Sequence, residues 1–165
     1  MIFKKILEKI NKNEKTSLAT IIQKNKNSPR QIGSKIIVTE NKKLYGNIGQ
    51  GKIEQETYQH MLTNIQTQKI EIIKAKMDKK DMETTCSICG GDIFLLIEPI
   101  QKENKTIYQQ IVKNQENNKI TILKTKINQD NTLTKTIIEP DNSIMKFLEK
   151  NKLYYANNEI IELIN

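Results

Sequence analysis

Five consecutive apolar residues, from Ile93 to Ile97, place the strongest constraint on the fold of this 165-residue chain. Successive side chains of a strand point to opposite faces, so an unbroken apolar run predicts a strand that is covered on both faces. Pro99 ends this strand, because proline has no N–H group to donate to a neighbouring strand. The chain is long enough to bury such a strand in a core without disulfides or a metal.

Apolar periodicity divides the rest of the chain into short helices and strands. We expect helices near residues 2–10, 52–65, 103–115 and 142–148, and strands at residues 17–22, 35–39, 44–48, 70–75, 93–97, 120–127, 133–138, 153–155 and 160–164. Several strands follow one another across polar turns, which favours hairpins over a doubly wound parallel sheet. The expected fold is α/β (α+β), a mixed β-sheet with helices packed on it, in a single compact domain over residues 1–165.

The chain is basic, with a formal net charge of +8. Its lysines are spread along the sequence, with no aromatic residues interleaved among basic ones, so we expect a solvated basic surface and no nucleic-acid site. The first eight residues are too highly charged for a signal peptide, and no apolar stretch approaches the roughly 18 residues of a membrane span. The sequence therefore predicts a cytoplasmic protein without a membrane segment.

The two cysteines, Cys86 and Cys89, precede Gly90-Gly91 and the buried strand. A structural zinc site needs two further Cys or His ligands, and His60 is the only histidine. A thioredoxin-like pair opens a helix, whereas here the glycines lead into a strand. The remaining interpretation is a thiolate on a glycine loop that binds a soft metal or a cofactor; the alternative is a pair of inert core residues.

Two further segments are candidates for binding an anion. Arg30, the one arginine among 27 basic residues, follows Ser28-Pro29 on a rigid loop and is suited to a phosphate or carboxylate, although it is also compatible with an ordinary surface arginine. Gly49-Gln50-Gly51 separates a strand from a helix that begins at Lys52, where free amides and the helix dipole favour an anion. A tight turn explains the same pattern, and Glu54 in the first helical turn complements the dipole in either case.

Three motifs in order carry a family resemblance: Ser28-Pro29-Arg30 with Gly33, then Gly46-Asn-Ile-Gly49-Gln-Gly51-Lys-Ile-Glu54, then Cys89-Gly90-Gly91 running into Ile97-Glu98-Pro99. Together they resemble the N-terminal domain of the XdhC/CoxI family, accessory proteins for xanthine dehydrogenase and related molybdenum hydroxylases. The resemblance covers residues 17–100, and residues 101–165 are expected to complete the domain.

The resemblance implies an accessory protein that is not itself an enzyme. Such proteins bind the molybdenum cofactor (molybdopterin) transiently, protect it while a cysteine desulfurase supplies its terminal sulfur, and deliver it to the apo molybdenum hydroxylase; self-association into a homodimer is left open. Carried onto this chain, Cys89 would lie nearest the molybdenum, with Cys86 as a second thiol on the metal side. The other cofactor-binding residues that the resemblance implies are Ser28, Arg30, Gly49, Gly51, Lys52, Glu54, Gly90 and Gly91.

The chain departs from the family pattern in two respects. Family members usually show Gly-Gly-Gly-Cys where this chain has Gly49-Gln50-Gly51-Lys52, so either Cys86 substitutes for the missing thiol or Lys52 contributes a phosphate contact. Many members also continue into a Rossmann domain, and no glycine-rich turn of that type follows Ile100. The alternative function is a thiol redox or metal-transfer protein that uses only the Cys86/Cys89 pair.

Overall fold

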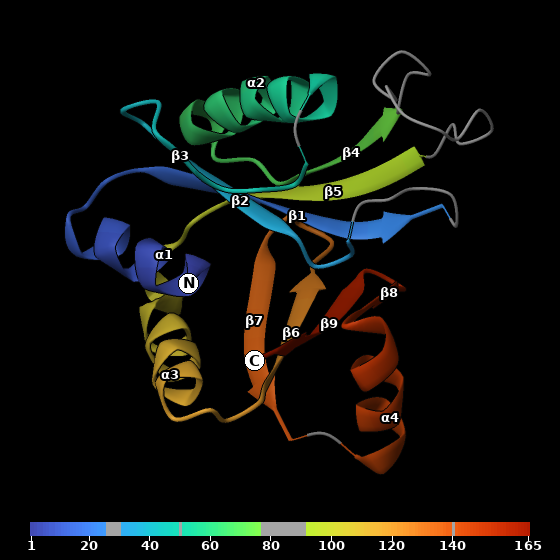
Figure 1. Cartoon of the computed structure of the whole chain (residues 1–165). Helices are drawn as coiled ribbons and strands as arrows, with labels where there is room; N and C mark the ends of the chain where they lie inside the picture. Colours follow the sequence, from blue (N-terminus) through green and yellow to red (C-terminus); the bar gives the residue numbers. More distant parts are fainter. Residues whose placement is uncertain (26–30, 50, 77–91, 140) are drawn as a thin grey trace. The chain divides into compact units, whose positions relative to one another are not determined.

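The computed structural model describes residues 1–25, 31–49, 51–76, 92–139 and 141–165. The chain divides into two compact units, one formed by Thr16–Pro99 and the other by Met1–Lys15 together with Ile100–Asn165. Each unit contains one β-sheet (Figure 1).

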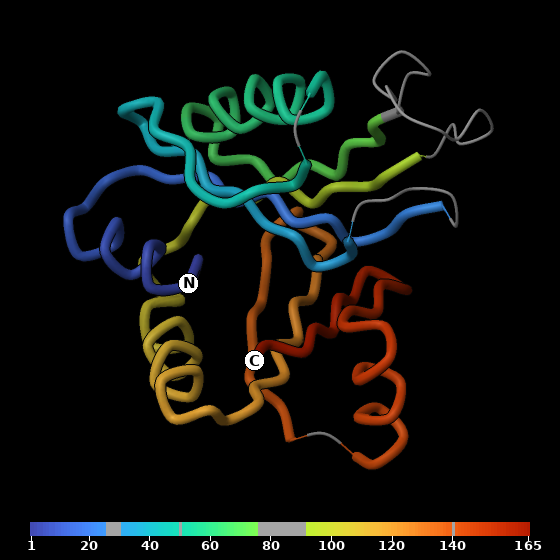
Figure 2. Tube along the Cα trace, viewed as in Figure 1, coloured from blue at the N-terminus to red at the C-terminus, as the bar shows by residue number. Residues whose placement is uncertain are grey.

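The unit Thr16–Pro99 contains a five-stranded sheet in the order β3-β2-β1-β5-β4. Its elements are β1 (Thr16–Lys24), β2 (Lys35–Thr39), β3 (Leu44–Gly46), α2 (Lys52–Thr67), β4 (Glu71–Lys76) and β5 (Asp92–Pro99). All four strand pairings are antiparallel. After β3 the chain continues through α2 to β4 (Figure 2), and these two strands form opposite edges of the sheet.

Helix α2 packs on one face of this sheet. Its apolar side chains recur at helical spacing, and Ile53, Met61 and Ile65 are buried in the same core cluster as side chains from the strands. The apolar run in β5 contributes Ile93, Leu95 and Ile97 to this cluster. Its remaining members are Ala19, Ile21, Ile36, Val38, Ile48 and Ala75. Leu96, on the opposite face of β5, is also buried, which confirms the prediction of a strand covered on both faces.

The second unit contains a four-stranded sheet in the order β7-β6-β9-β8 with antiparallel pairings. Its elements are α1 (Ile2–Asn11), the 3-10 turn η2 (Lys102–Asn104), α3 (Lys105–Glu116), β6 (Thr121–Ile127), β7 (Leu133–Ile138), α4 (Asn142–Asn151), β8 (Leu153–Ala156) and β9 (Glu159–Ile164). The rings of Phe3 on α1 and Tyr108 on α3 stack with centroids 6.2 Å apart. Leu148 of α4 packs with Ile122 and Leu163 of the sheet.

Hydrogen bonds lower the pKa of three carboxyl groups in this unit. Lys5 and then Lys12 donate to Glu8 and lower its pKa to about 2. The hydroxyl and the backbone N–H of Thr132 lower the pKa of Asp130. Asp141 is the N-cap of α4, and the N–H of Ile144 lowers its pKa in the manner expected for a capping carboxylate.

The predicted α/β class is confirmed, but the expected mixed sheet is in fact two antiparallel sheets. The connection β3–α2–β4 joins two strands that run in the same direction, as a parallel crossover does. Because these strands lie at opposite edges, with three antiparallel strands between them, the crossover creates no parallel neighbours. Local sequence patterns do not encode which strands become neighbours, so the error lies in pairing and not in the elements.

Candidate functional site

Three connections leave the five-stranded sheet at the same end. The ladder pairs Lys35 of β2 with Thr20 near the end of β1, and Gly46 at the end of β3 with Ile36. At the other edge, Lys76 ends β4 opposite Asp92, which begins β5. Strand β1 therefore ends and β2 begins at this end of the sheet, on either side of residues 26–30. Strand β3 also ends there, at Gly46, and so do the end of β4 and the start of β5, on either side of residues 77–91.

The strands at this end are staggered. Strand β1 continues from Thr20, opposite the start of β2, to Lys24, opposite Ile93 of β5. Four residues of strand correspond to about 13 Å, so β1, β5 and β4 extend beyond β2 and β3 by roughly that length. The N–H of Asn25 prolongs the pairing by donating to the carbonyl of Asp92 at 3.0 Å. The end of β3 at Gly46 is therefore set back, along the strand direction, from Asp92 at the start of β5.

The turn between β3 and α2 is held in place at both ends. Ile48 before it and Ile53 after it are both buried in the core cluster. The N–H of Asn47 donates to the carbonyl of Lys35 at 3.1 Å, and the side-chain oxygen of Asn47 accepts from the N–H of Gly49 at 2.5 Å. The amide of Gly49 therefore already has an acceptor within the turn.

Helix α2 begins without a side-chain cap. Its N-cap is Gly51, with φ 106° and ψ −159°, a region of backbone space that is essentially restricted to glycine. The first amides of an α-helix have no acceptor inside the helix, and the helix dipole gives this end a partial positive charge. Lys52 adds a cationic side chain, which lies 3.8 Å from the carboxylate of Glu56 on the exposed surface. A glycine N-cap, a helix N-terminus and a lysine side chain therefore lie together at this turn.

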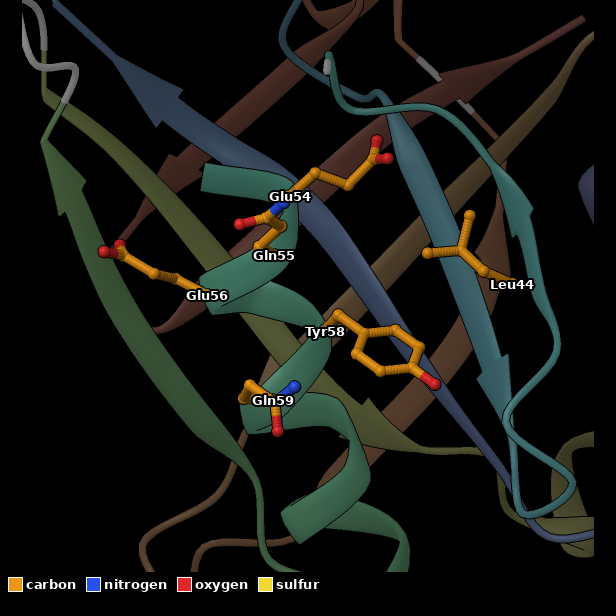
Figure 3. A pocket seen from close by; sticks show the side chains of 6 residues that line it. All are labelled: Leu44, Glu54, Gln55, Glu56, Tyr58 and Gln59. Carbon is orange, nitrogen blue, oxygen red and sulfur yellow. The ribbon is translucent and has the colours of Figure 1, made fainter. Parts of the chain in front are cut away.

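Glu54, in the first turn of α2, faces a groove beside β3. It lines a groove of about 430 Å³ between β3 and α2, together with Leu44, Gln55, Glu56, Tyr58 and Gln59. Figure 3 shows the Glu54 carboxyl group and the Tyr58 ring projecting toward the strand that carries Leu44, whereas Glu56 projects from the other side of the helix. The Tyr58 hydroxyl donates to the carbonyl of Lys42 at 3.2 Å, which fixes the ring over the β2–β3 turn.

Sequence analysis did not predict the ion pair between Lys74 of β4 and Asp92 at the start of β5. Lys74 of β4 lies 2.6 Å from the carboxylate of Asp92, and its ammonium group lies 5.8 Å from the centre of the Phe94 ring. These residues are far apart in sequence and become neighbours only through the β4–β5 register. The register, and not a local motif, is the signal that could have predicted the pair.

The structure places four of the predicted site residues, Gly49, Gly51, Lys52 and Glu54, on one turn and the first helical turn that follows it. Ser28, Arg30, Cys86, Cys89, Gly90 and Gly91 lie outside the described residues. Gln50, within the turn, also lies outside them.

His60 of α2 has a partner on strand β4. Its Nδ1 lies 3.0 Å from a carboxylate oxygen of Glu71, and both side chains are exposed. Within the described ranges, no group of three or more His, Cys, Asp or Glu side chains is arranged to hold a metal ion. Among the helices described, none combines the length and the apolar character needed to span a bilayer.

The comparison with protein families agrees with the resemblance. The model of the XdhC and CoxI family matches residues 10–74, a range that includes the glycine turn and all of α2. The predicted resemblance is therefore confirmed over these residues. A search of curated proteins found no match.

A solved structure shows the same fold. It is described as a xanthine dehydrogenase from Bacillus halodurans, and it superposes on 99% of this chain with a TM-score of 0.69 and 15% sequence identity. The match covers 52% of that protein, so this chain spans about half its length. At this identity the likeness establishes a common fold.

Proposed function

We propose that this protein is an accessory factor that binds the molybdenum cofactor and delivers it to a molybdenum hydroxylase of the xanthine dehydrogenase type. One observation carries the proposal: the described residues that flank Ser28-Pro29-Arg30, Gly49-Gln50-Gly51 and Cys89-Gly90-Gly91 all lie at the same end of the five-stranded sheet. The family match over residues 10–74 and the fold shared with a protein described as a xanthine dehydrogenase support it.

The described residues fit the phosphate group of such a cofactor. Gly51, the N-cap residue, lacks a Cβ that would fill the space in front of the helix, and it has no side chain to cap the amides of the first helical turn. Backbone amides and a helix N-terminus are well suited to phosphate, and Lys52 supplies a cation beside them. In this proposal the first turn of α2 binds the phosphate, and Lys52 replaces the cysteine that family members usually carry at this position.

The roles of the thiols and of Arg30 follow from the resemblance. Cys89 is proposed to lie nearest the molybdenum, with Cys86 as a second thiol, because thiolates bind soft metals. Ser28 and Arg30 are proposed to contact the phosphate together with Gly90 and Gly91. The bound cofactor would supply the redox chemistry of the hydroxylase, whereas this chain would bind it, exclude water from it and release it. A cytoplasmic location, a cysteine desulfurase as sulfur donor and a homodimer are parts of the same proposal.

Anaerobic titration with molybdenum cofactor tests the proposal. Wild type should bind saturably, Cys89→Ala should weaken binding by removing the metal-side thiol, and Lys52→Gln should weaken it about tenfold by removing a charge-assisted contact. Lys43→Gln is the matched control, because Lys43 is an exposed lysine in the turn at the opposite end of β2 and β3. Absence of wild-type binding would refute the proposal. Binding by wild type that is insensitive to Lys52→Gln would refute the assignment of the phosphate to α2.

A thiol redox or metal-transfer function is the second candidate. It rests on the Cys86-x-x-Cys89 spacing and requires neither Lys52 nor the glycine turn. Reversible disulfide formation in a protein that does not bind the cofactor would favour it.

A further inference from the structure

A half-buried carboxylate without a partner faces the groove between β3 and α2. Throughout residues 1–25, 31–49, 51–76, 92–139 and 141–165, no hydrogen bond or ion pair involves the side chain of Glu54. The chain carries 27 basic residues, and the neighbouring Glu56 does have a cation within 4 Å, that of Lys52. An unpaired carboxylate is therefore not a consequence of a shortage of lysines.

The side chains around Glu54 have the composition of an ammonium-binding site. Residues 54 and 58 are four apart on α2, so Glu54 and the Tyr58 ring lie on the same helix face (Figure 3). Aromatic ring faces attract cations, and the carboxylate supplies a full negative charge. Leu44, whose side chain is partly exposed on the edge strand β3, offers an aliphatic surface to the carbon chain of a ligand.

The geometry of the groove is fixed before any ligand binds. The Tyr58 hydroxyl is bonded to the carbonyl of Lys42, and Ile53 anchors the start of α2 in the core. The volume of about 430 Å³ lies within the range of small-molecule sites, and none of the described residues that line it is a lysine or an arginine. A preformed groove with one unpaired carboxylate, one ring and one aliphatic side chain selects a cation that carries an apolar stem.

We propose that this groove binds a primary alkylammonium group, with Glu54 as its counter-ion and Tyr58 and Leu44 as the walls for its carbon chain. The group is either a free aliphatic amine or the side chain of a lysine on a protein partner. This inference goes beyond the proposed function: it assigns Glu54 to a cation on the β3 side of α2, separate from the phosphate proposed at Gly51 and Lys52.

Titration of the ¹⁵N-labelled protein with n-butylammonium, followed by amide chemical shifts, tests the inference. Saturable shifts are expected at Leu44 and at residues 54–59, and n-butanol should not reproduce them. Glu54→Gln should weaken binding about tenfold or more, because a charge-assisted hydrogen bond is lost. Glu71→Gln is the matched control, since Glu71 is an exposed glutamate on β4, at the opposite edge of the sheet from β3, and it should change the affinity by no more than about twofold.

A second arm identifies the source of the ammonium group and protects the test against misfolding. An acetyl-Gly-Lys-Gly-amide peptide that binds about tenfold tighter than n-butylammonium would indicate a lysine of a protein partner, whereas equal or weaker binding would indicate a free amine. Tyr58→Phe, which retains the ring, should bind better than Tyr58→Leu. The inference would be overturned by any of three results: chemical-shift changes that do not saturate with n-butylammonium, equal changes with n-butanol, or an unchanged affinity for n-butylammonium in a folded Glu54→Gln protein. None of these results depends on molybdenum cofactor binding.

Discussion

Replacement of Gly51 by alanine tests the argument that the start of α2 requires glycine. The backbone of Gly51, at φ 106° and ψ −159°, lies in a region where a Cβ is strained, at a cost of about 1–3 kcal/mol. A protein of this length loses about 2–4 °C of melting temperature per kcal/mol, so Gly51→Ala should melt about 2–12 °C below wild type. Thermal melting followed by far-ultraviolet circular dichroism, together with urea unfolding, measures the loss.

Two controls separate backbone strain from other effects of the substitution. Gln59→Ala changes an exposed position on the same helix, where alanine is favoured, and should stay within about 0.5 kcal/mol of wild type. Gly51→D-Ala, prepared by ligation at Cys86, carries a Cβ of the opposite chirality, for which these angles are unstrained, and should retain wild-type stability. A Gly51→Ala protein as stable as wild type would refute the reasoning, because a Cβ would then fit at the helix start.

The remaining predictions concern the core, the α4 cap and the β4–β5 ion pair. Ile97→Ala removes a fully buried side chain and should cost about 2–5 kcal/mol in urea unfolding with an unchanged m-value; a cost below 1 kcal/mol would contradict its place in the core. The pKa of Asp141 in the folded protein lies below its ordinary 3.8, so its stabilising effect is complete above pH 3.8 and is lost as the pH falls through the folded pKa. Asp141→Asn retains the cap and should remove this pH dependence of stability in acid titrations. An acid-unfolding profile that is unchanged in Asp141→Asn would contradict the stabilising role of the carboxylate. A double-mutant cycle with Lys74→Met and Asp92→Asn should give a coupling of about 0–1 kcal/mol that decreases with salt, whereas coupling that is independent of salt would refute a solvent-screened pair.

The sequence predicted elements well where local patterns determine them. The apolar run ending at Pro99 gives β5, the 35–39 pattern gives β2, and the change from glycine turn to helical periodicity at Lys52 gives the start of α2. In each case the local signal and the tertiary environment agree, because the buried side chains follow the period of the element that forms. The family motifs were likewise local in sequence, and the resemblance they suggested is confirmed over residues 10–74.

Features that depend on strand pairing could not be predicted. The Lys74–Asp92 pair exists because β4 and β5 adopt one register, and a shift of one residue would turn the two side chains to opposite faces. The position of Glu54 in a groove depends on Leu44 of β3, which follows a turn and lies ten residues earlier in the chain. Sequence reasoning assigned Glu54 to the helix dipole and the cofactor, because nothing in the local pattern places β3 beside α2.

A map of amide chemical shifts on anaerobic addition of molybdenum cofactor to the ¹⁵N-labelled protein tests whether the start of α2 binds the cofactor. Among the described residues, the largest changes are expected at Gly51, Lys52 and Ile53, with smaller changes at Gly49, whose amide already donates a hydrogen bond to the Asn47 side chain. Changes confined to the unit formed by residues 1–15 and 100–165, or to the groove residues Leu44 and Gln59, would contradict the proposed site.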